Sequence, residues 1–283
     1  IGTDGAGLLQ QEEFGGDVIP VETEATVIVC IQEDSHNRLW IGTFQSGLIC
    51  IEEGRRKQYT SKNSDLLSDN VYGIEEDEQG NIWMAFLEGI IQKLDPSTGQ
   101  MSTIYNDVNV NIRDLINNGD GRLFAATSKG LLVIDTNTEQ WHYATHNSQS
   151  NNILLPQTCI YALYKDSKQT LWLGTSDGLT CWNMQNDSVG HLTTTDGLAI
   201  NLISSITEDH NGQIWVGSYN GISCIDQSHT PCRITNYDTS DGLETNEINQ
   251  RAICTLSNGN IIFGTSKGLA VIIPKQETPI SYD

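Results

Sequence analysis

One short sequence shape recurs down the whole chain and limits what the chain can fold into. Its fullest copy is Leu171-Trp-Leu-Gly-Thr-Ser-Asp-Gly-Leu179. Further copies begin at Leu39, Ile82, Leu123, Ile214 and Ile261, and a shortened copy spans Ile1–Leu8. The tryptophan position, which recurs about every 41 to 48 residues, is filled by Trp40, Trp83, Phe124, Trp172, Trp215 and Ile262. A period in the forties, with short strands and turn residues, is typical of propeller blades.

Each full repeat reads as three strands followed by a weaker fourth. The first strand alternates apolar and polar residues, as in Val71–Asp77, and a tight turn such as Asn211-Gly212 follows it. Asn and Gly supply the positive φ that a hairpin turn needs. The tryptophan strand comes next, then a glycine, then the third strand, and finally a weak outer strand such as Trp141–Ala144. This order predicts a four-stranded antiparallel blade.

The repeat therefore predicts an all-β fold, a β-propeller with seven blades of four-stranded antiparallel sheets. The first blade is expected to be incomplete at its N-terminal strands, and the chain to be a piece of a longer protein. We expect a single propeller over residues 1–273 and a tail over 274–283 that leads to a following domain or forms an outer strand. The predicted blade cores are 1–10, 27–60, 70–105, 111–144, 159–193, 202–237 and 249–273.

The charge balance restricts the partners. The chain has 36 acidic and 15 basic residues, which gives a net charge of −21, and the acidic residues are spread through all repeats. Such a field argues against binding to nucleic acid or directly to an anionic membrane, because both need clusters of Lys and Arg. Solubility is the simplest consequence of this charge.

The seven cysteines do not indicate a metal site. Cys50, Cys181 and Cys224 occupy a repeat position that Val133 also fills, so we interpret them as small apolar core residues. Paired CxxC motifs are absent from the sequence, so neither a zinc cluster nor another metal site is predicted. Cys224 and Cys232 could pair across a loop.

Most of the residues that resemble catalytic groups recur in the repeat. Three pairs look like acid/base pairs: Glu33-Asp34, Glu76-Asp77 and Glu208-Asp209. Each precedes a hairpin turn, however, and the backbone N–H groups of that turn can donate hydrogen bonds to the aspartate. We expect the tryptophans to pack between neighbouring blades. A nucleophile beside a base cannot be named, so no catalytic residue and no cofactor is predicted. The histidines lie in turns or in variable segments: His36, His142, His146, His191, His210 and His229.

The positions that vary between repeats are candidates for ligand binding. In a propeller the loops between second and third strands share one face with the segments that enter each first strand. Aromatic rings, amides and charges of both signs converge there, which suits a polar ligand with rings, such as a sugar. The candidates are Phe44, Gln45, Tyr72, Glu88, Arg113, Lys129, Tyr161, Asp177, Tyr219, Asn220, Arg251 and Lys267.

The repeat resembles that of the two-component regulator propellers. The shared pattern is an Ile-x-Glu-Asp stretch, a turn glycine, then Ile-Trp-Ile-Gly-Thr and a final Gly-Leu. The copies with Phe124 and Ile262 depart from it at the Trp position. Asp241–Asn249, followed by Gly259–Gly264, looks like the closing blade of the second periplasmic propeller in hybrid two-component sensors of glycan-using bacteria. Ile273-Pro274 and Thr278-Pro279 look like the entry to the β-sandwich that follows it.

This resemblance implies a non-enzymatic, periplasmic sensor domain of an inner-membrane hybrid histidine kinase. It would bind a polysaccharide breakdown product and transmit a rearrangement of a homodimer inward. The implied partners are an oligosaccharide, a preceding propeller and a following β-sandwich of the same chain, and a second copy of the parent protein. Two alternatives stay open. One is a propeller lyase that uses a His, a carboxylate and a divalent ion near the channel, and the other is a scaffold or dimerisation propeller.

Overall fold

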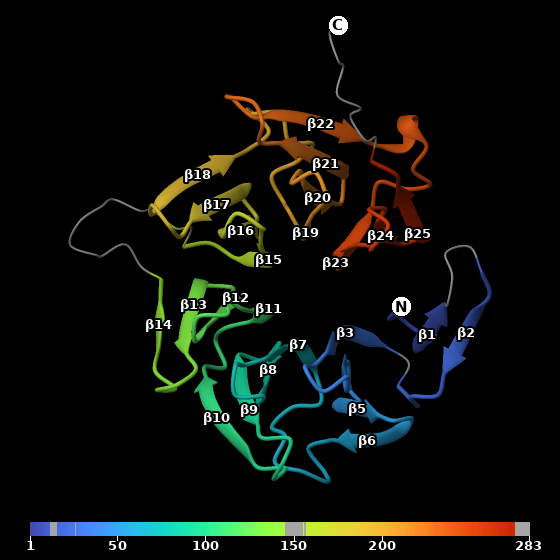
Figure 1. Ribbon diagram of the computed structural model, residues 1–283, viewed down its shortest axis with the longest axis vertical. Coiled ribbons are helices and arrows are strands. Elements are labelled where there is room, and N and C mark those ends of the chain that lie inside the picture. The colour runs from blue at the N-terminus through green and yellow to red at the C-terminus, as the bar shows by residue number, and fades with distance from the viewer. Residues whose placement is uncertain (12–15, 26, 145–154, 156, 275–283) are drawn as a thin grey trace, which may run out of the picture. The chain divides into compact units, whose positions relative to one another are not determined.

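The computed structural model describes residues 1–11, 16–25, 27–144, 155 and 157–274. The chain divides into two compact units, Ile1–Ala144 and Thr145–Asp283, called here the N-terminal and C-terminal units. Both units are built from antiparallel sheets whose strands follow one another in chain order (Figure 1). Within the described residues one short 3₁₀ helix, η1 (Thr239–Asp241), lies among the strands. No helix of the described part has the length and apolar composition of a membrane span.

The N-terminal unit holds one two-stranded and three four-stranded sheets, β1-β2, β3-β4-β5-β6, β7-β8-β9-β10 and β11-β12-β13-β14. Its strands are β1 (Leu8–Gln11), β2 (Val18–Val21), β3 (Ile28–Glu33), β4 (Leu39–Thr43), β5 (Leu48–Glu52), β6 (Arg55–Tyr59), β7 (Val71–Glu76), β8 (Ile82–Phe86), β9 (Ile90–Leu94), β10 (Met101–Asn106), β11 (Ile112–Asn117), β12 (Arg122–Thr127), β13 (Gly130–Asp135) and β14 (Trp141–Tyr143). The first strands β3, β7 and β11 lie side by side.

The C-terminal unit holds two four-stranded sheets, β15-β16-β17-β18 and β19-β20-β21-β22, and the three-stranded sheet β23-β24-β25. Its strands are β15 (Ile160–Lys165), β16 (Thr170–Thr175), β17 (Leu179–Asn183), β18 (Ser188–Leu192), β19 (Ser205–Glu208), β20 (Ile214–Ser218), β21 (Gly221–Asp226), β22 (Arg233–Tyr237), β23 (Ile248–Thr255), β24 (Ile261–Thr265) and β25 (Gly268–Ile272). Here β15, β19 and β23 lie side by side.

These sheets confirm the predicted fold class, an all-β propeller of four-stranded antiparallel blades. The shortened first copy keeps only the end of a second strand, where Ile1 and Leu9 exchange backbone hydrogen bonds of 2.7 and 2.8 Å. One first strand is short, because β19 has four residues whereas β7 and β15 each have six. The predicted boundaries of a single propeller over 1–273 stay a prediction, and tail residues 275–283 lie outside the described part.

The tryptophans fill the space between neighbouring sheets, as predicted. Trp40 of β4 packs with Ile74 and Met84 of the next sheet, and Trp172 of β16 packs with Ile206 of the next sheet in its own unit. Trp83 is completely buried. Burying an aromatic side chain of this size removes about 150–250 Å² from water, worth roughly 4–6 kcal/mol at 25 cal/mol per Å². Each tryptophan therefore contributes much of the apolar contact between two sheets.

A buried aspartate joins the tryptophan to the hairpin turn before it. Asp77 Oδ1 accepts hydrogen bonds from the backbone N–H groups of Gln79 and Asn81 at 3.0 and 2.9 Å, and Asp77 Oδ2 accepts one from Trp83 Nε1 at 2.7 Å. Three other sheets repeat this Asp–Trp pair, with indole distances of 2.7, 2.8 and 3.0 Å for Asp34–Trp40, Asp166–Trp172 and Asp209–Trp215. The aspartates of the apparent acid/base pairs are therefore structural.

The pKa of Asp34 reflects this arrangement. Burial raises it, but hydrogen bonds from Trp40, Arg38 and the His36 backbone outweigh burial, and the pKa lies below its ordinary value. Besides the two-stranded sheet β1-β2, two described sheets lack the Asp–Trp pair, and in both of them the two residues are replaced together. Asn118 precedes Phe124, and Leu256 precedes Ile262, with the six-residue spacing of Asp77 and Trp83 unchanged.

The glutamate before the aspartate ties one sheet to the preceding one. Glu76 of β7 accepts hydrogen bonds from the Ser35 backbone N–H and from Ser35 Oγ, both at 2.7 Å. In the C-terminal unit, Glu208 accepts the same two bonds from Ser167 at 2.8 and 2.6 Å. The glutamate of each of these two pairs therefore also has a structural role in the repeat.

None of the seven cysteines, which all lie within the described residues, forms a disulfide. Cys50 and Cys224 are buried as predicted, and burial raises the pKa of the first to about 11 and of the second to about 12. The suggested Cys224–Cys232 pairing is absent. Cys224 contacts the Gln213 side chain instead, with Sγ 3.7 Å from Oε1.

We expect Asp77→Ala to lower the free energy of unfolding by about 2–4 kcal/mol, because a charged acceptor is lost and the buried Trp83 indole N–H is left without a partner. The matched control is Glu78→Ala, an exposed neighbour whose carboxylate makes one long bond of 3.3 Å to the Gly121 N–H. Its cost should stay within about 0.5 kcal/mol. Urea unfolding of both variants measures the difference, and equal costs would contradict the role given to Asp77.

Candidate functional site

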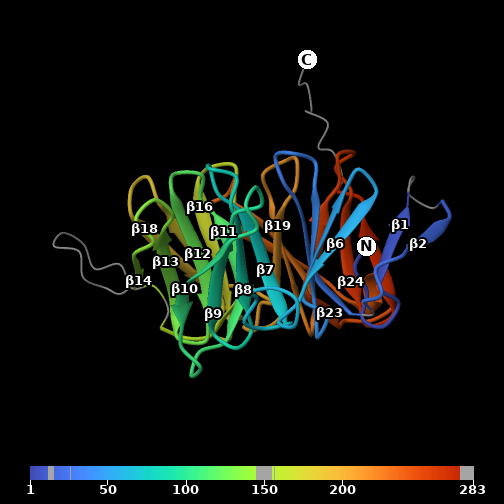
Figure 2. The same cartoon turned by 90° about the horizontal axis from the view of Figure 1, so that it is seen from below.

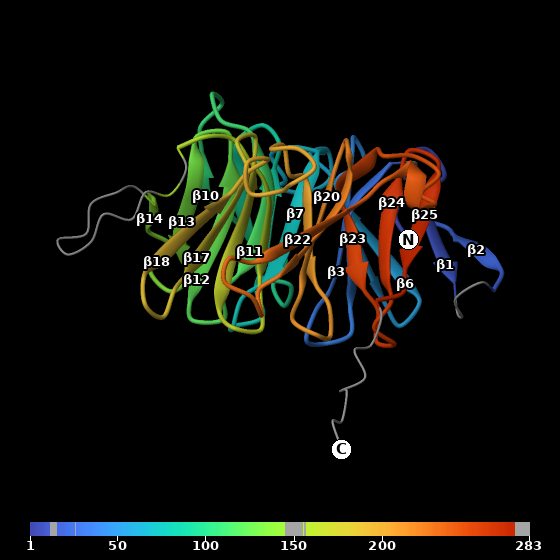
Figure 3. The ribbon, with the colours of Figure 1, turned by 90° about the horizontal axis from the view of Figure 1, so that it is seen from above.

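Each sheet has two chemically different ends. At one end, called the turn end, a hairpin turn joins the first and second strands. At the other, called the loop end, the second strand passes into the third and the first strand begins. The register shows this, because the start of each first strand pairs with the end of the second, as in Val71↔Phe86 and Ile112↔Thr127. Figures 2 and 3 show the strands running between these two ends. All predicted site residues lie at the loop end.

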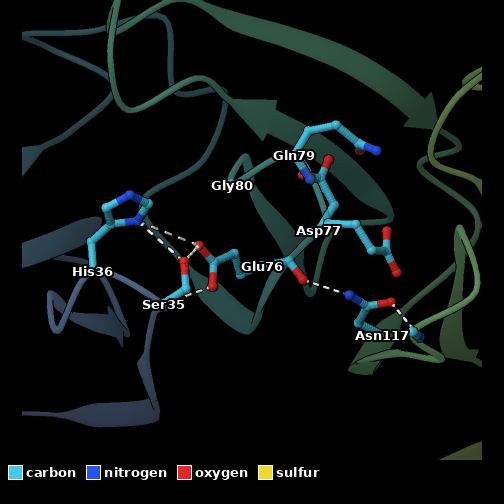
Figure 4. A pocket seen from close by; sticks show the side chains of 9 residues that line it. Ser35, His36, Glu76, Asp77, Gln79, Gly80 and Asn117 are labelled. Atoms are coloured by element: carbon cyan, nitrogen blue, oxygen red, sulfur yellow. Dashed lines mark hydrogen bonds and ion pairs between the residues drawn. The ribbon is translucent and has the colours of Figure 1, made fainter.

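The turn end of the N-terminal unit carries an open pocket of about 440 Å³. It lies over the turns of three successive sheets (Figure 4). Its lining residues are Ser35, His36, Glu76, Asp77, Glu78, Gln79, Gly80, Asn117 and Gly119. This pocket was not predicted, since each of these residues belongs to a turn that looks unremarkable on its own.

Three of these side chains superficially resemble a Ser–His–acid triad. Ser35 Oγ lies 3.1 Å from His36 Nδ1 and donates to Glu76 Oε1, while His36 Nδ1 lies 4.0 Å from the same oxygen (Figure 4). A catalytic serine would instead donate its proton to the histidine, which a carboxylate orients from the far side of the ring. Ser167 and Glu208 make the same contact with a lysine in the histidine's place. The pocket therefore results from the serine–glutamate hydrogen bonds that join neighbouring sheets.

The loop end is shaped by a β-bulge that recurs at one position of the first strand. The ladder slips between Ile112 and Asp114 in β11, so that the register with β12 skips Arg113. The same slip occurs in β3, β7 and β15, where the extra residues are Val29, Tyr72 and Tyr161. A bulge turns its extra side chain away from the regular alternation, and bulges are common beside binding sites. Three of the four bulge residues are predicted site residues.

In the N-terminal unit the structure brings several predicted residues together. Burial raises the pKa of Tyr72, while nearby Arg113 lowers it and nearby Glu88 raises it, so the three groups are within electrostatic reach of one another. Glu88 also accepts hydrogen bonds from the Asn70 side chain and, at 3.0 Å, from Ser68 Oγ. We call Asn70, Tyr72, Glu88 and Arg113 the loop-end cluster. It combines a phenol, an amide, a carboxylate and a guanidinium group.

The remaining predicted residues of this unit surround the cluster less closely. Phe44 is 37% exposed on the β4–β5 loop, and the Gln45 backbone N–H donates to Asn70 Oδ1 at 2.9 Å. Lys129 on the β12–β13 loop pairs with Asp107 at 3.0 Å. This ion pair is exposed, so its contribution to stability is small.

The C-terminal unit presents a second group at its own loop end. Tyr219 is 57% exposed, the Asn220 side chain donates to Ala199 O at 3.2 Å, and Lys267 Nζ donates to Glu244 O at 3.1 Å. Asp177 is exposed on the β16–β17 loop. The Asn220 and Lys267 side chains are thus held by the backbone of neighbouring loops, and the Asp177 backbone N–H donates to Thr175 Oγ1 at 3.0 Å.

An irregular stretch of β23 contains Arg251 and contacts Tyr161 through the neighbouring Gln250. The ladder jumps from Ile248↔Thr265 to Ile253↔Phe263, and Arg251 within the jump has φ +57°. The Arg251 backbone N–H donates to Ser204 O at 3.0 Å, and the neighbouring Gln250 side chain donates to Tyr161 O at 2.9 Å.

Sequence reasoning missed Gln250, although a signal was available. The interval from the first residue of this strand to the residue before its turn is two residues longer than in the other repeats.

The loops between second and third strands are stabilised by a recurring Thr or Ser at the end of the second strand. Thr43 Oγ1 donates to Gly47 O at 2.7 Å, and five further copies repeat this bond from Thr3, Thr127, Thr175, Ser218 and Thr265 to the loop glycine. Within the described part no group of three or more His, Cys, Asp and Glu is placed to hold a metal ion. The loop end is thus arranged to form hydrogen bonds and ring contacts with a polar molecule.

Comparison with known proteins agrees with this repeat structure. The family described as "Two component regulator propeller" matches residues 24–45, 65–86, 154–177 and 197–220. These four segments are the four that contain the Asp–Trp pair. Four repeats of the chain are thus similar to two-component regulator propeller repeats. The copies with Phe124 and Ile262, which lack the pair, lie outside the matched segments.

The named proteins that this chain is similar to are much longer than the chain itself. "Histidine kinase P4" of Formosa agariphila is 26% identical over 307 residues, which cover 100% of this chain and 22% of that protein. The extracellular domain of a hybrid two-component system of B. thetaiotaomicron has TM-score 0.67 and 20% identity, over 87% of this chain and 33% of its own. This chain thus spans about a fifth of the curated relative.

An enzyme shares the fold as well. A virginiamycin B lyase of Staphylococcus aureus has TM-score 0.69 at 14% identity, covering 90% of this chain and 83% of its own. At such identities a likeness shows the fold alone.

We expect Gly89→Ala to destabilise the N-terminal unit far more than Gly99→Ala. Both glycines have left-handed φ values, +78° and +76°, so both substitutions cost about 1 kcal/mol of backbone strain. At Gly89 a Cβ would also overlap the carbonyl oxygens of Asp107 and Val110, whereas nothing lies within 4 Å at Gly99. Overlap of this kind costs about 1–3 kcal/mol more. Denaturant midpoints measure both, and equal midpoints would contradict the loop geometry.

Proposed function

We propose that this chain is a ligand-sensing propeller from the periplasmic part of a membrane two-component regulator. Its ligand would be a polysaccharide breakdown product, and the parent protein would be a hybrid sensor histidine kinase. The observation that carries the proposal is the coincidence of two-component regulator propeller repeats with a variable polar loop end. The propeller itself would have no catalytic role, since the proposal assigns the chemistry to the kinase part of the parent.

The chemistry of the loop-end cluster supports a sugar-like ligand. The Tyr72 ring offers a flat face to the apolar side of a sugar ring, and the Asn70 amide and Glu88 carboxylate can bond hydroxyl groups. The Arg113 guanidinium adds fixed donors, and it would favour a ligand that carries a carboxylate or many hydroxyl oxygens. A mixed set of this kind binds through several modest contacts rather than one dominant group.

Signalling requires more than binding. The ligand must bind one arrangement of the parent homodimer more tightly than the other, or no equilibrium shifts. Under this proposal the propeller acts with a preceding propeller and a following β-sandwich of the same chain. A tenfold preference for one arrangement corresponds to about 1.4 kcal/mol, which two or three extra hydrogen bonds at the loop end would supply.

The likeness to a lyase suggests the strongest alternative. Such an enzyme would need a histidine near a carboxylate and a divalent ion at the loop end. Among the described histidines, His191 of β18 comes nearest to a second-to-third-strand loop, and its Nδ1 lies 3.0 Å from Thr180 Oγ1. It lies on an outer strand rather than on the first strand or in a loop, so we favour the sensor.

Calorimetric titration tests the proposal, using this chain and the whole ectodomain against neutral and uronate-containing oligosaccharides. We expect Arg113→Ala to weaken binding at least tenfold (about 1.4 kcal/mol) through the loss of charge-assisted bonds. Arg122→Ala is the matched control, because Arg122 lies at the turn end of the same sheet and pairs with Asp120.

The outcomes separate the alternatives. Binding by the ectodomain alone, unaffected by Arg113→Ala, would move the ligand away from this loop end and leave this propeller a scaffold. Turnover of an oligosaccharide by the purified chain would overturn the sensor role in favour of a lyase.

A further inference from the structure

Two of the seven cysteines, Cys181 and Cys232, belong to neighbouring sheets of the C-terminal unit and pack against the same apolar cluster. Cys181 lies on β17 opposite Trp172 of β16, so the two side chains share the face that packs against the next sheet. Cys232 directly precedes β22 and stands two residues before Ile234, so both are on the side of that sheet toward Cys181. Both cysteines pack against one apolar cluster that includes Ile206.

The Cys232 thiol is close enough to Cys181 to affect the ionisation of Cys181. Burial is the main cause of the raised pKa of Cys181, and the Cys232 thiol raises it further. Burial raises the pKa of Cys232 as well. Both residues are only half-buried, so a small oxidant can reach them.

A second pair of cysteines shows why sharing a cluster is not sufficient. Cys30 and Cys50 also pack in one apolar cluster. They lie on β3 and β5 of the same sheet, with β4 between them. Two strand spacings amount to about 9–10 Å, beyond the ~7 Å Cα separation that a disulfide spans. Cys181 and Cys232 belong to two different sheets, so their side chains enter the shared cluster from opposite sides instead of lying parallel on one sheet.

We propose that Cys181 and Cys232 are a disulfide-forming pair that cross-links the sheets β15–β18 and β19–β22 under oxidising conditions. A thiolate of one cysteine attacks a disulfide donor, such as glutathione disulfide, and releases one glutathione. The second thiolate then attacks the mixed disulfide and releases the other. Two thiols lose two protons and two electrons, and the donor is reduced to two thiols. Disulfides persist outside the cytoplasm, which agrees with the periplasmic location proposed above.

The cross-link should stabilise the unit without changing its fold. It would close a loop from residue 181 to residue 232, and a loop of this length constrains the unfolded chain strongly. A rise in Tm of about 5–10 °C is expected for a unit of this size. The reaction should be slow at pH 7 and about tenfold faster per pH unit up to about pH 8.5. The raised pKa values keep the thiolate fraction small there, and it grows with pH.

The test is to incubate the chain with glutathione disulfide at pH 8.5, block free thiols and map the peptides. No Lys or Arg lies between Lys168 and Arg233, so a protease that cuts at acidic residues is needed to separate the cysteines. We expect a Cys181–Cys232 cross-linked peptide, five blocked thiols and the rise in Tm. Cys181→Ser and Cys232→Ser should each abolish all three effects, whereas Cys254→Ser should abolish none.

Two results would overturn the proposal. One is stable attachment of glutathione to Cys181 or Cys232 without a cross-link, which would show that the sulfur atoms cannot meet. The other is a cross-link between Cys232 and Cys224, its neighbour along the chain. Because Cys181→Ser and Cys232→Ser are compared with Cys254→Ser in the reduced state as well, a simple loss of folding is visible as a lower Tm before oxidation.

Discussion

A buried carboxylate that accepts three hydrogen bonds is the interaction on which the standard blade depends. In Asp77, Asp34, Asp166 and Asp209 one oxygen holds two N–H groups of the hairpin turn and the other holds an indole N–H. The carboxylate therefore fixes the turn geometry and the orientation of the tryptophan at once. Because the tryptophan in turn fills the gap to the next sheet, a local polar contact determines packing between sheets. Where the indole is replaced by Phe124 or Ile262, the aspartate is replaced too, since a buried charge without donors would be costly.

The two ends of each sheet consequently have different tasks. At the turn end almost every polar side chain is used within the repeat, including Glu76 and Ser35, which join two sheets. At the loop end the repeat uses only the Thr or Ser hydroxyl and the glycine, and the other side chains differ from one sheet to the next. The pocket at the turn end is therefore less informative about function than the variable side chains of the loop end.

The fold was predictable because its determinants are local and repeated. Trp40 and Trp83 mark the same strand 43 residues apart, and the glycine after each marks the same loop. The candidate site was predictable only as a set of positions. Tyr72 and Arg113 could be assigned to the loop end, but their proximity to Glu88 depends on a bulge that the alternation pattern does not reveal. The bond from Gln250 to Tyr161 joins residues 89 positions apart and depends on two extra residues in one strand. The indole–carboxylate bond also went unpredicted, because the spacing of six residues has no meaning until the hairpin is built.

The bulge in the first strands has a consequence for how such a protein can change. Val29, Tyr72, Arg113 and Tyr161 occupy one structural position, yet they are an aliphatic, a phenol, a guanidinium and a second phenol. The four side chains differ in size and charge, although the backbone around each of them follows the same register slip. Under the proposed sensor role, substitutions at this one position would change ligand recognition while the strand register stays the same. A library randomised at these four positions would explore ligand preference while most of its members still fold.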